Sequence, residues 1–118
     1  MAEIAEVEVE FLPPEKGGRR IPVCLSPDCE THYRPHLRVC GGSGEYLGIE
    51  FIDGPNGPVE PCVVTRATVR FVYEPDVCYD ALVVGSRFEV MEGPRVVATG
   101  KVIRRPRSGE PADAMDSR

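Results

Sequence analysis

The chain has 118 residues, 42% of them hydrophobic, and this length suits one domain with a single buried core. Its formal net charge of −5, from 19 acidic and 14 basic side chains, opposes nonspecific binding to phosphate backbones. No apolar run is long enough to cross a bilayer, and residues 1–12 hold glutamates but no basic residue, so we expect a cytoplasmic protein without a membrane partner.

The chain begins with a regular alternation of apolar and acidic residues. From Ala5 to Phe11 the odd positions are apolar and the even positions are glutamates, which predicts a strand with one buried face and one wet face. In the clearest later segment, Ala67, Val69 and Phe71, together with Tyr73, are expected to point into the core. Further extended segments are predicted at 19–25, 33–40, 45–52, 63–73, 87–92 and 96–104.

Glycine and proline mark the connections between these segments. Residues 41–44 and 53–58 are predicted loops, and Gly93 with Pro94 predicts a tight turn between the last two strands. No window of ten or more residues has helical spacing, so the fold class is all-β. A closed barrel is favoured over a sandwich because closure removes exposed strand edges. We predict a barrel over residues 1–104 and a disordered tail over residues 105–118.

The sequence holds five cysteines, Cys24, Cys29, Cys40, Cys62 and Cys78. An odd number without a secretion signal favours reduced thiols over a disulfide framework. A free cysteine behaves as a small hydrophobic residue, so Cys62 and Cys78 are expected to be buried.

Both histidines lie among three of these cysteines, in the order Cys24, Cys29, His32, His36 and Cys40. Thiolate and imidazole groups could hold zinc, and a thiolate beside a histidine could act as a nucleophile. However, the spacing matches no standard zinc finger, and no third group is evident that would orient a catalytic pair. We therefore expect neither a metal nor a catalytic residue, and Cys24, Cys29, His32 and His36 are the ligands to test if a metal binds.

No nucleotide site is evident either. The glycine-rich stretch 41–44 lacks the Lys-Ser/Thr of a phosphate loop and opens a strand rather than a helix. We therefore predict no cofactor and no enzyme activity. The arginines are the remaining candidates for a function, because guanidinium groups on a shared face would bind phosphates or carboxylates. Arginines scattered over the surface would merely aid solubility.

Three stretches of the sequence resemble one known family. Residues 88–102, Phe-Glu-Val-Met-Glu-Gly-Pro-Arg-Val-Val-Ala-Thr-Gly-Lys-Val, resemble without a gap the closing hairpin of the C-terminal barrel of translation elongation factor Tu, F-x-I-R-E-G-G-R-T-V-G-A-G-x-V. Upstream, residues 15–22, Glu-Lys-Gly-Gly-Arg-Arg-Ile-Pro, are similar to that family's E-E-G-G-R-H-T-P. Residues 33–36, Tyr-Arg-Pro-His, are similar to its Y-R-P-Q. The stretches keep the family's order, and the resemblance covers about residues 3–104.

The resemblance implies a six-stranded antiparallel barrel that contacts other macromolecules. In the family this barrel packs on the GTP-binding domain, is touched by the exchange factor and grips the T-stem backbone of aminoacyl-tRNA. The tRNA-facing positions of the family's motifs correspond to Arg19, Arg20, His36, Glu92 and Gly93. Arg34, in the second motif, completes the set of RNA- or partner-binding candidates.

The departures from the family pattern limit what can be carried over. Arg20 stands where the family has histidine, and His36 stands where it has glutamine. The GTPase domain and the middle barrel are missing, and a lone barrel cannot hydrolyse GTP. We expect a non-catalytic module that binds a protein partner, with binding of tRNA or another structured RNA as the alternative.

Overall fold

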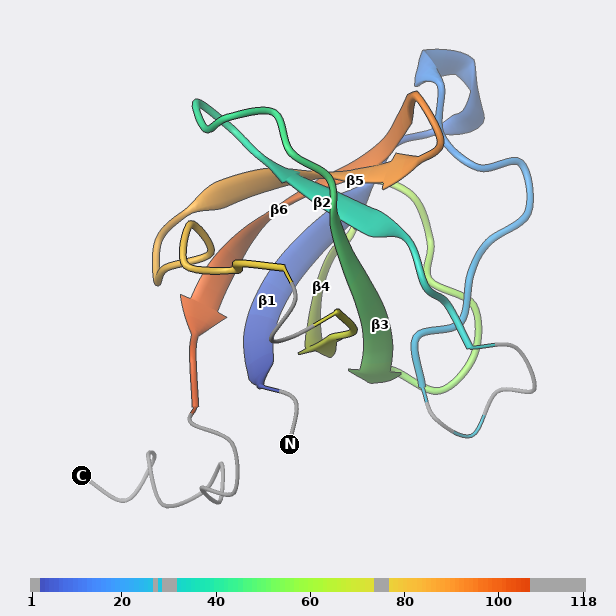
Figure 1. Ribbon diagram of the computed structural model, residues 1–118. Helices are drawn as coiled ribbons and strands as arrows, with labels where there is room; N and C mark the ends of the chain where they lie inside the picture. The colour runs from blue at the N-terminus through green and yellow to red at the C-terminus, as the bar shows by residue number, and fades with distance from the viewer. Residues whose placement is uncertain (1–2, 27, 29–31, 74–76, 107–118) are drawn as a thin grey trace.

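The computed structural model describes residues 3–26, 28, 32–73 and 77–106. These residues form an all-β fold in which six antiparallel strands close into one barrel (Figure 1). Around the barrel the strand order is β1-β4-β3-β2-β5-β6, and β6 pairs with β1 to complete the ring. The strands are β1 Ile4–Phe11, β2 His36–Val39, β3 Leu47–Asp53, β4 Val64–Phe71, β5 Arg87–Glu92 and β6 Arg95–Arg104.

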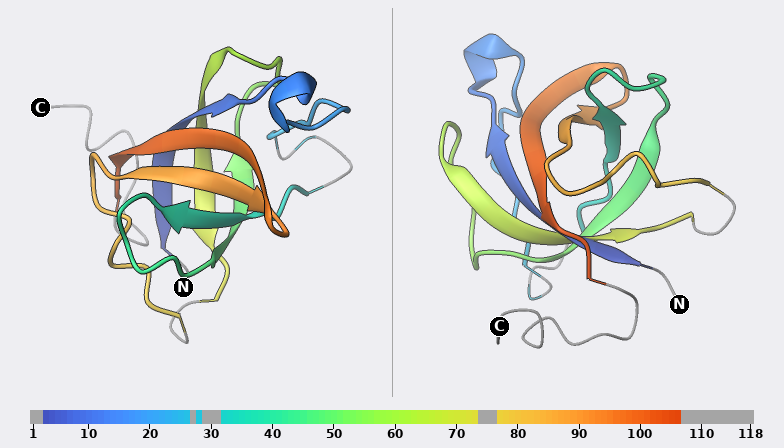
Figure 2. Two further views of the ribbon diagram at one scale, coloured as in Figure 1. Left: turned by 90° about the horizontal axis from the view of Figure 1, so that it is seen from above. Right: turned by 90° about the vertical axis from the view of Figure 1, so that its left-hand side faces the viewer.

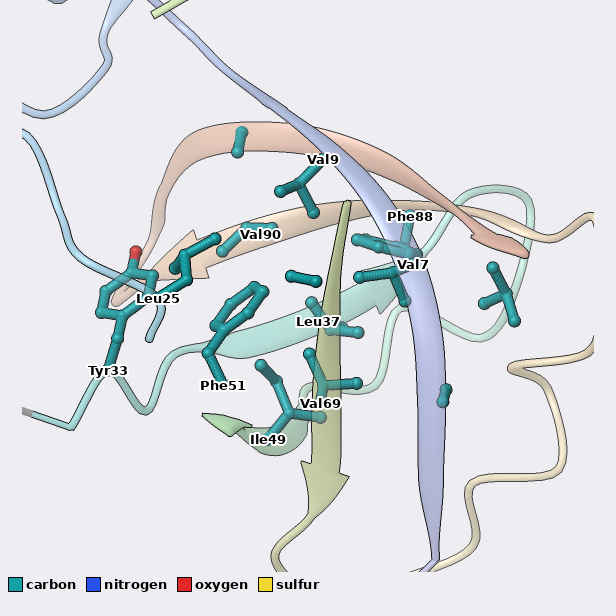
Figure 3. Packing of buried hydrophobic residues seen from close by; sticks show 14 of the residues in the cluster. Val7, Val9, Leu25, Tyr33, Leu37, Ile49, Phe51, Val69, Phe88 and Val90 are labelled. Carbon is teal, nitrogen blue, oxygen red and sulfur yellow. The ribbon is translucent and has the colours of Figure 1, made fainter. Parts of the chain in front are cut away.

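Alternation along the strands determines which side chains enter the barrel. The odd positions of β1 and the inner positions of β4 are at most 7% exposed, as their patterns predict. They pack with inward residues of every other strand, and ten of these core side chains are labelled in Figure 3. The outer face carries cross-strand ion pairs, such as Arg38 of β2 with Glu89 of β5 and Arg104 of β6 with Glu6 of β1. The predicted fold class is therefore confirmed.

Closure of the barrel depends on a glycine in β6. Gly100 lies between Val9 of β1 and Phe88 of β5. A Cβ atom there would lie 2.6 Å from the Phe88 ring and would also overlap a backbone oxygen of β1. The missing side chain lets β6 bend tightly between its two neighbours, as the strongly curved β6 in Figure 2 illustrates.

Two connections agree with the turn signals. Residues 40–46 join β2 to β3 as an antiparallel connection, with positive φ at Gly41 and Gly44. Gly93 has φ of 59° in the tight turn between β5 and β6. A short 3₁₀ helix, η1 (Pro14–Lys16), follows β1 and ends at Gly17, whose φ is 96°.

The extended segment predicted at 19–25 does not form a strand. Pro22 has no N–H to donate. The carbonyl of Ile21 accepts a hydrogen bond from the side chain of Arg19 and so is not paired with a neighbouring strand. The segment instead crosses the barrel end as a loop. The N–H of Val59 donates a hydrogen bond to the carbonyl of Val23, and the buried Leu25 anchors the loop in the core.

Other boundaries move inward by a few residues. The predicted strand 33–40 is regular only as β2, because Pro35 cannot donate to a ladder. Tyr73 is 51% exposed instead of buried, since it lies beyond the end of β4 and its ring covers Gly48 from outside.

At the other end of the chain, Arg105 donates hydrogen bonds to the carbonyls of Tyr79 and Leu82. The remainder of the predicted tail, 107–118, lies outside the described residues.

The cysteines differ from the expectation. Cys62 and Cys78 are exposed, as is Cys40, and all three are free thiols. Cys62 stands in a loop with φ of 65°, and Cys78 precedes the buried Tyr79 in another loop, so neither belongs to an inward strand position. Cys24 is disulfide-bonded, against the expectation of reduced thiols. Because disulfides are rare in the cytosol, the cytoplasmic setting stays a prediction from the sequence.

Within the described ranges, no helix has the length and apolar character that a membrane span requires.

Candidate functional site

The candidate residues gather at the barrel end where β5 turns into β6. Glu92, the last residue of β5, forms ion pairs with Arg19 from the loop after η1 and with Arg95 at the start of β6. The hydroxyl of Tyr33 donates to the same carboxylate at 2.5 Å. We call Arg19, Tyr33, Glu92 and Arg95 the Glu92 cluster. It joins three segments that lie far apart in the sequence.

Tyr33 connects this cluster to the core. Its ring stacks on Phe51 with centroids 5.6 Å apart and lies 6.3 Å from the ring of Phe11. The guanidinium of Arg19 stands over the Tyr33 ring at 5.3 Å from its centroid, a cation–π contact. Figure 3 shows Tyr33 and Phe51 packed beside Leu25 at one end of the core. The polar cluster therefore rests on a rigid aromatic base.

The electrostatics stabilise the ionised carboxylate. Partial burial alone would raise the pKa of Glu92, but hydrogen bonds from Tyr33 and Arg19 outweigh it and lower that pKa. Burial and the bond to Glu92 raise the pKa of the Tyr33 hydroxyl, so it remains a donor. The pKa of Arg19 is raised as well, since Glu92 outweighs the opposing effect of burial. At neutral pH the cluster therefore holds one carboxylate between two guanidinium groups, both of which are ion-paired to it.

A second carboxylate organises the neighbouring surface. Glu50 of β3 is 7% exposed and accepts a 2.5 Å bond from Arg70 of β4. Arg34 lies 3.5 Å from the same oxygen, and Nδ1 of His32 lies 3.1 Å from the other. The bond from Arg70 is the main cause that lowers the pKa of Glu50, against the effect of burial. We call these four residues the Glu50 cluster.

The predicted site residues are therefore only partly brought together. Arg19, Glu92 and the exposed turn residue Gly93 share the hairpin end, whereas Arg34 belongs to the Glu50 cluster. Arg20 is exposed, with no ion pair among the described residues. His36 begins β2, where its ring lies 6.0 Å from that of Tyr46.

The metal candidates are not assembled into a site. His32 faces Glu50, His36 faces Tyr46, and the sulfur of Cys24 is engaged in a disulfide and so is not a thiolate ligand. Cys29 lies outside the described residues. Among the residues that the structure does describe, no three histidine, cysteine or acidic side chains are close enough to share a metal ion.

Sequence reasoning named Glu92 but missed Glu50, the carboxylate that holds Arg34 and Arg70. Glu50 sits at an outward position of β3, and outward glutamates are normally solvated. Tyr33 was quoted in the Tyr-Arg-Pro-His motif, but its hydroxyl finds a partner 59 residues away. No local spacing signals such contacts. The register of β5 beside β2 brings Glu92 near Tyr33, by pairing His36 with Met91, and the register of β3 beside β4 pairs Glu50 with Arg70.

Chemically, the surface can contact charged and polar groups but offers no activated nucleophile among these residues. The fold and the surface together define the class, a closed six-stranded antiparallel β-barrel whose surface carries two clusters of arginines around a shared glutamate. No protein-family model matches the chain, and no curated protein has a significantly similar sequence.

Proposed function

We propose that this barrel is a non-catalytic module that binds a protein partner through the surface around Ile21 and the β5–β6 hairpin. The supporting observation is that Arg19 and Arg95 both contact the carboxylate of Glu92, and that Arg34 shares the carboxylate of Glu50 with Arg70. An arginine that already holds a carboxylate would have to break that pair to bind a phosphate. A site for duplex RNA needs uncompensated positive charge, and the net charge of −5 works against it.

The composition of this surface suits a protein partner. Ile21 is 73% exposed, and Arg20 beside it is exposed as well. A shallow pocket next to them is lined largely by Phe11, Val23, Val59 and Pro61. Protein interfaces typically combine an apolar centre with tyrosine and arginine and a polar rim. The Glu92 cluster would supply that rim.

The three stretches that resemble the C-terminal barrel of elongation factor Tu are the basis for proposing a relation to it. The proposal therefore includes a role related to translation, in which the barrel docks on a protein as that family's barrel docks on its neighbours. Because a fold does not determine a function, the partner has to be found by experiment.

The test compares tagged wild-type protein with Ile21→Glu, purified from the source organism. We expect at least one protein to co-purify at constant stoichiometry with wild type and to fall at least about tenfold with Ile21→Glu, as for a central contact. Val84→Glu is the matched control, because Val84 is 62% exposed and precedes β5, at the opposite end of that strand from the hairpin.

Two results would overturn the proposal. The first is an identical set of co-purifying proteins with both variants. The second is salt-sensitive binding of purified wild type to total tRNA that disappears in Arg19→Ala/Arg20→Ala, which would establish the RNA alternative instead.

A further inference from the structure

The pocket beside Ile21 is small and has a mostly apolar lining. The apolar part of that lining comprises Phe11, Pro14, Pro22, Val23, Val59 and Pro61. Arg19 and Arg20 complete the lining. The pocket encloses about 50 Å³, far less than the roughly 300–1,000 Å³ of a site for a whole small molecule. Its size therefore suits one aliphatic side chain of a docked protein and is too small for a nucleotide.

Backbone hydrogen bonds hold this pocket in shape. The N–H of Val59 donates to the carbonyl of Val23, and the N–H of Cys62 donates to the carbonyl of Phe11. The side chains of Phe11 and Val59 are only 4% and 6% exposed, so they belong to the core as well as to the pocket. Three of the lining residues are prolines, whose rings fix φ. The pocket is therefore formed before a partner arrives, which lowers the entropy that binding costs.

The charges around the pocket leave an excess of positive charge. Arg20 is exposed and forms no ion pair or hydrogen bond with the part of the chain that the structure describes. The Glu92 cluster beside it holds two guanidinium groups and one carboxylate. The flanking residues Glu15, Lys16 and Glu60 add one positive and two negative charges. Positive groups thus outnumber acidic ones here, although the whole chain has a net charge of −5.

Arg20 is the group that remains available for a partner. A guanidinium binds a carboxylate through two parallel hydrogen bonds, whereas phosphate groups are usually bound by clusters of arginines. The two arginines of the Glu92 cluster are already held by Glu92, so Arg20 acts singly. Because Arg20 itself lines the pocket, a carboxylate bound to it lies close to the side chain in the pocket. We propose that this site binds a protein segment in which an aliphatic residue stands next to an aspartate or a glutamate.

This assignment rests on the proposed function, because it names the chemistry of the partner at the same surface. The probe is acetyl-Leu-Glu-amide, titrated into the full chain while backbone amide shifts are followed by NMR. We expect shifts concentrated at Arg20, Ile21 and Val59. Acetyl-Leu-Gln-amide should bind about two- to fivefold more weakly, the range for an exposed ion pair. Acetyl-Ala-Glu-amide should bind about tenfold more weakly, because it buries fewer carbon atoms.

The variant Arg20→Gln makes the test specific. Since Arg20 is exposed, the substitution should keep the fold, which well-dispersed amide shifts verify. The variant should bind the glutamate and glutamine peptides equally. Arg87→Gln is the matched control and should keep the preference for the glutamate peptide. Arg87 is exposed too, has no ion pair within the described ranges, and begins β5 at the strand end away from the hairpin.

Three results would overturn the proposal. The first is equal binding of the glutamate and glutamine peptides by wild type, and the second is a set of shifts confined to other surfaces. The third is inorganic phosphate that binds at Arg20 more tightly than the glutamate peptide does. If co-purification still depends on Ile21 in any of these cases, the proposed function stands with a partner of different chemistry.

Discussion

The carboxylate of Glu92 provides a direct test of the electrostatic reasoning, through the variant Glu92→Gln. The amide keeps one acceptor oxygen but loses the charge, and its NH₂ group must face either Arg95 or the pair of Tyr33 and Arg19, all of them donors. Hydrogen bonds to a charged group contribute about 1.5–3 kcal/mol when buried. Because the Glu92 side chain is 23% exposed, we expect a loss of about 1–2 kcal/mol at pH 7.

The effect should depend on pH in a defined direction. The folded-state pKa of Glu92 lies below the ordinary value of 4.5, so its stabilisation is fully present above that value. The stabilisation is lost as the pH falls through the folded-state pKa, where wild-type Glu92 becomes protonated. The difference between wild type and Glu92→Gln should therefore be full at pH 7 and smaller at pH 3, below the ordinary value.

Urea unfolding measures this difference at both pH values. Far-UV circular dichroism or tyrosine fluorescence can report it, since the chain has no tryptophan. Glu45→Gln is the matched control, because Glu45 is exposed and its side chain forms no ion pair or hydrogen bond with any residue that the structure describes. A Glu92→Gln effect equal to that of the control, or one that stays constant between pH 3 and 7, would refute the assigned role of Glu92.

Two further predictions concern the barrel itself. Gly100→Ala should lower the free energy of unfolding by about 3 kcal/mol or prevent folding, because its Cβ would meet both the Phe88 ring and a β1 backbone oxygen; an unchanged thermal midpoint would contradict this packing. Tyr79→Phe should cost about 1–3 kcal/mol in urea unfolding, because the buried hydroxyl donates to the carbonyl of Gly48 at 2.6 Å. Tyr73→Phe, on a half-exposed ring, is its control and should change stability by less than about 0.5 kcal/mol.

Where alternation is regular and turns carry their usual residues, the sequence predicted the elements closely. Strand β5 has the predicted bounds, and β1 differs by one residue at its start. The prediction was wrong at 19–25, where an apolar pattern was interpreted as a strand although Pro22 interrupts its hydrogen bonding. It was wrong as well for the exposed Cys62 and Cys78, because their burial was inferred from residue type and not from position in a strand.

The candidate site was less accessible to sequence reasoning. Arg19 and Glu92 were both named, but on the strength of a family resemblance, and nothing local to either position indicates that they form an ion pair across 73 residues of chain. The role of Glu50 was not foreseen, since an outward glutamate in an alternating strand resembles any solvated charge. Burial of its carboxylate follows from the two arginines and the histidine that cover it.

The sequence by itself determined the all-β class, the inward faces of the strands and the positions of the main turns. These depend on backbone geometry with a period of two residues and on conformational preferences of single residues, both of which are local. Only the tertiary structure decided which charged side chains pair with one another. That outcome depends on strand order and register. When β6 pairs with β1 to close the ring, side chains that are far apart along the chain become neighbours, and the sequence alone does not show which ones.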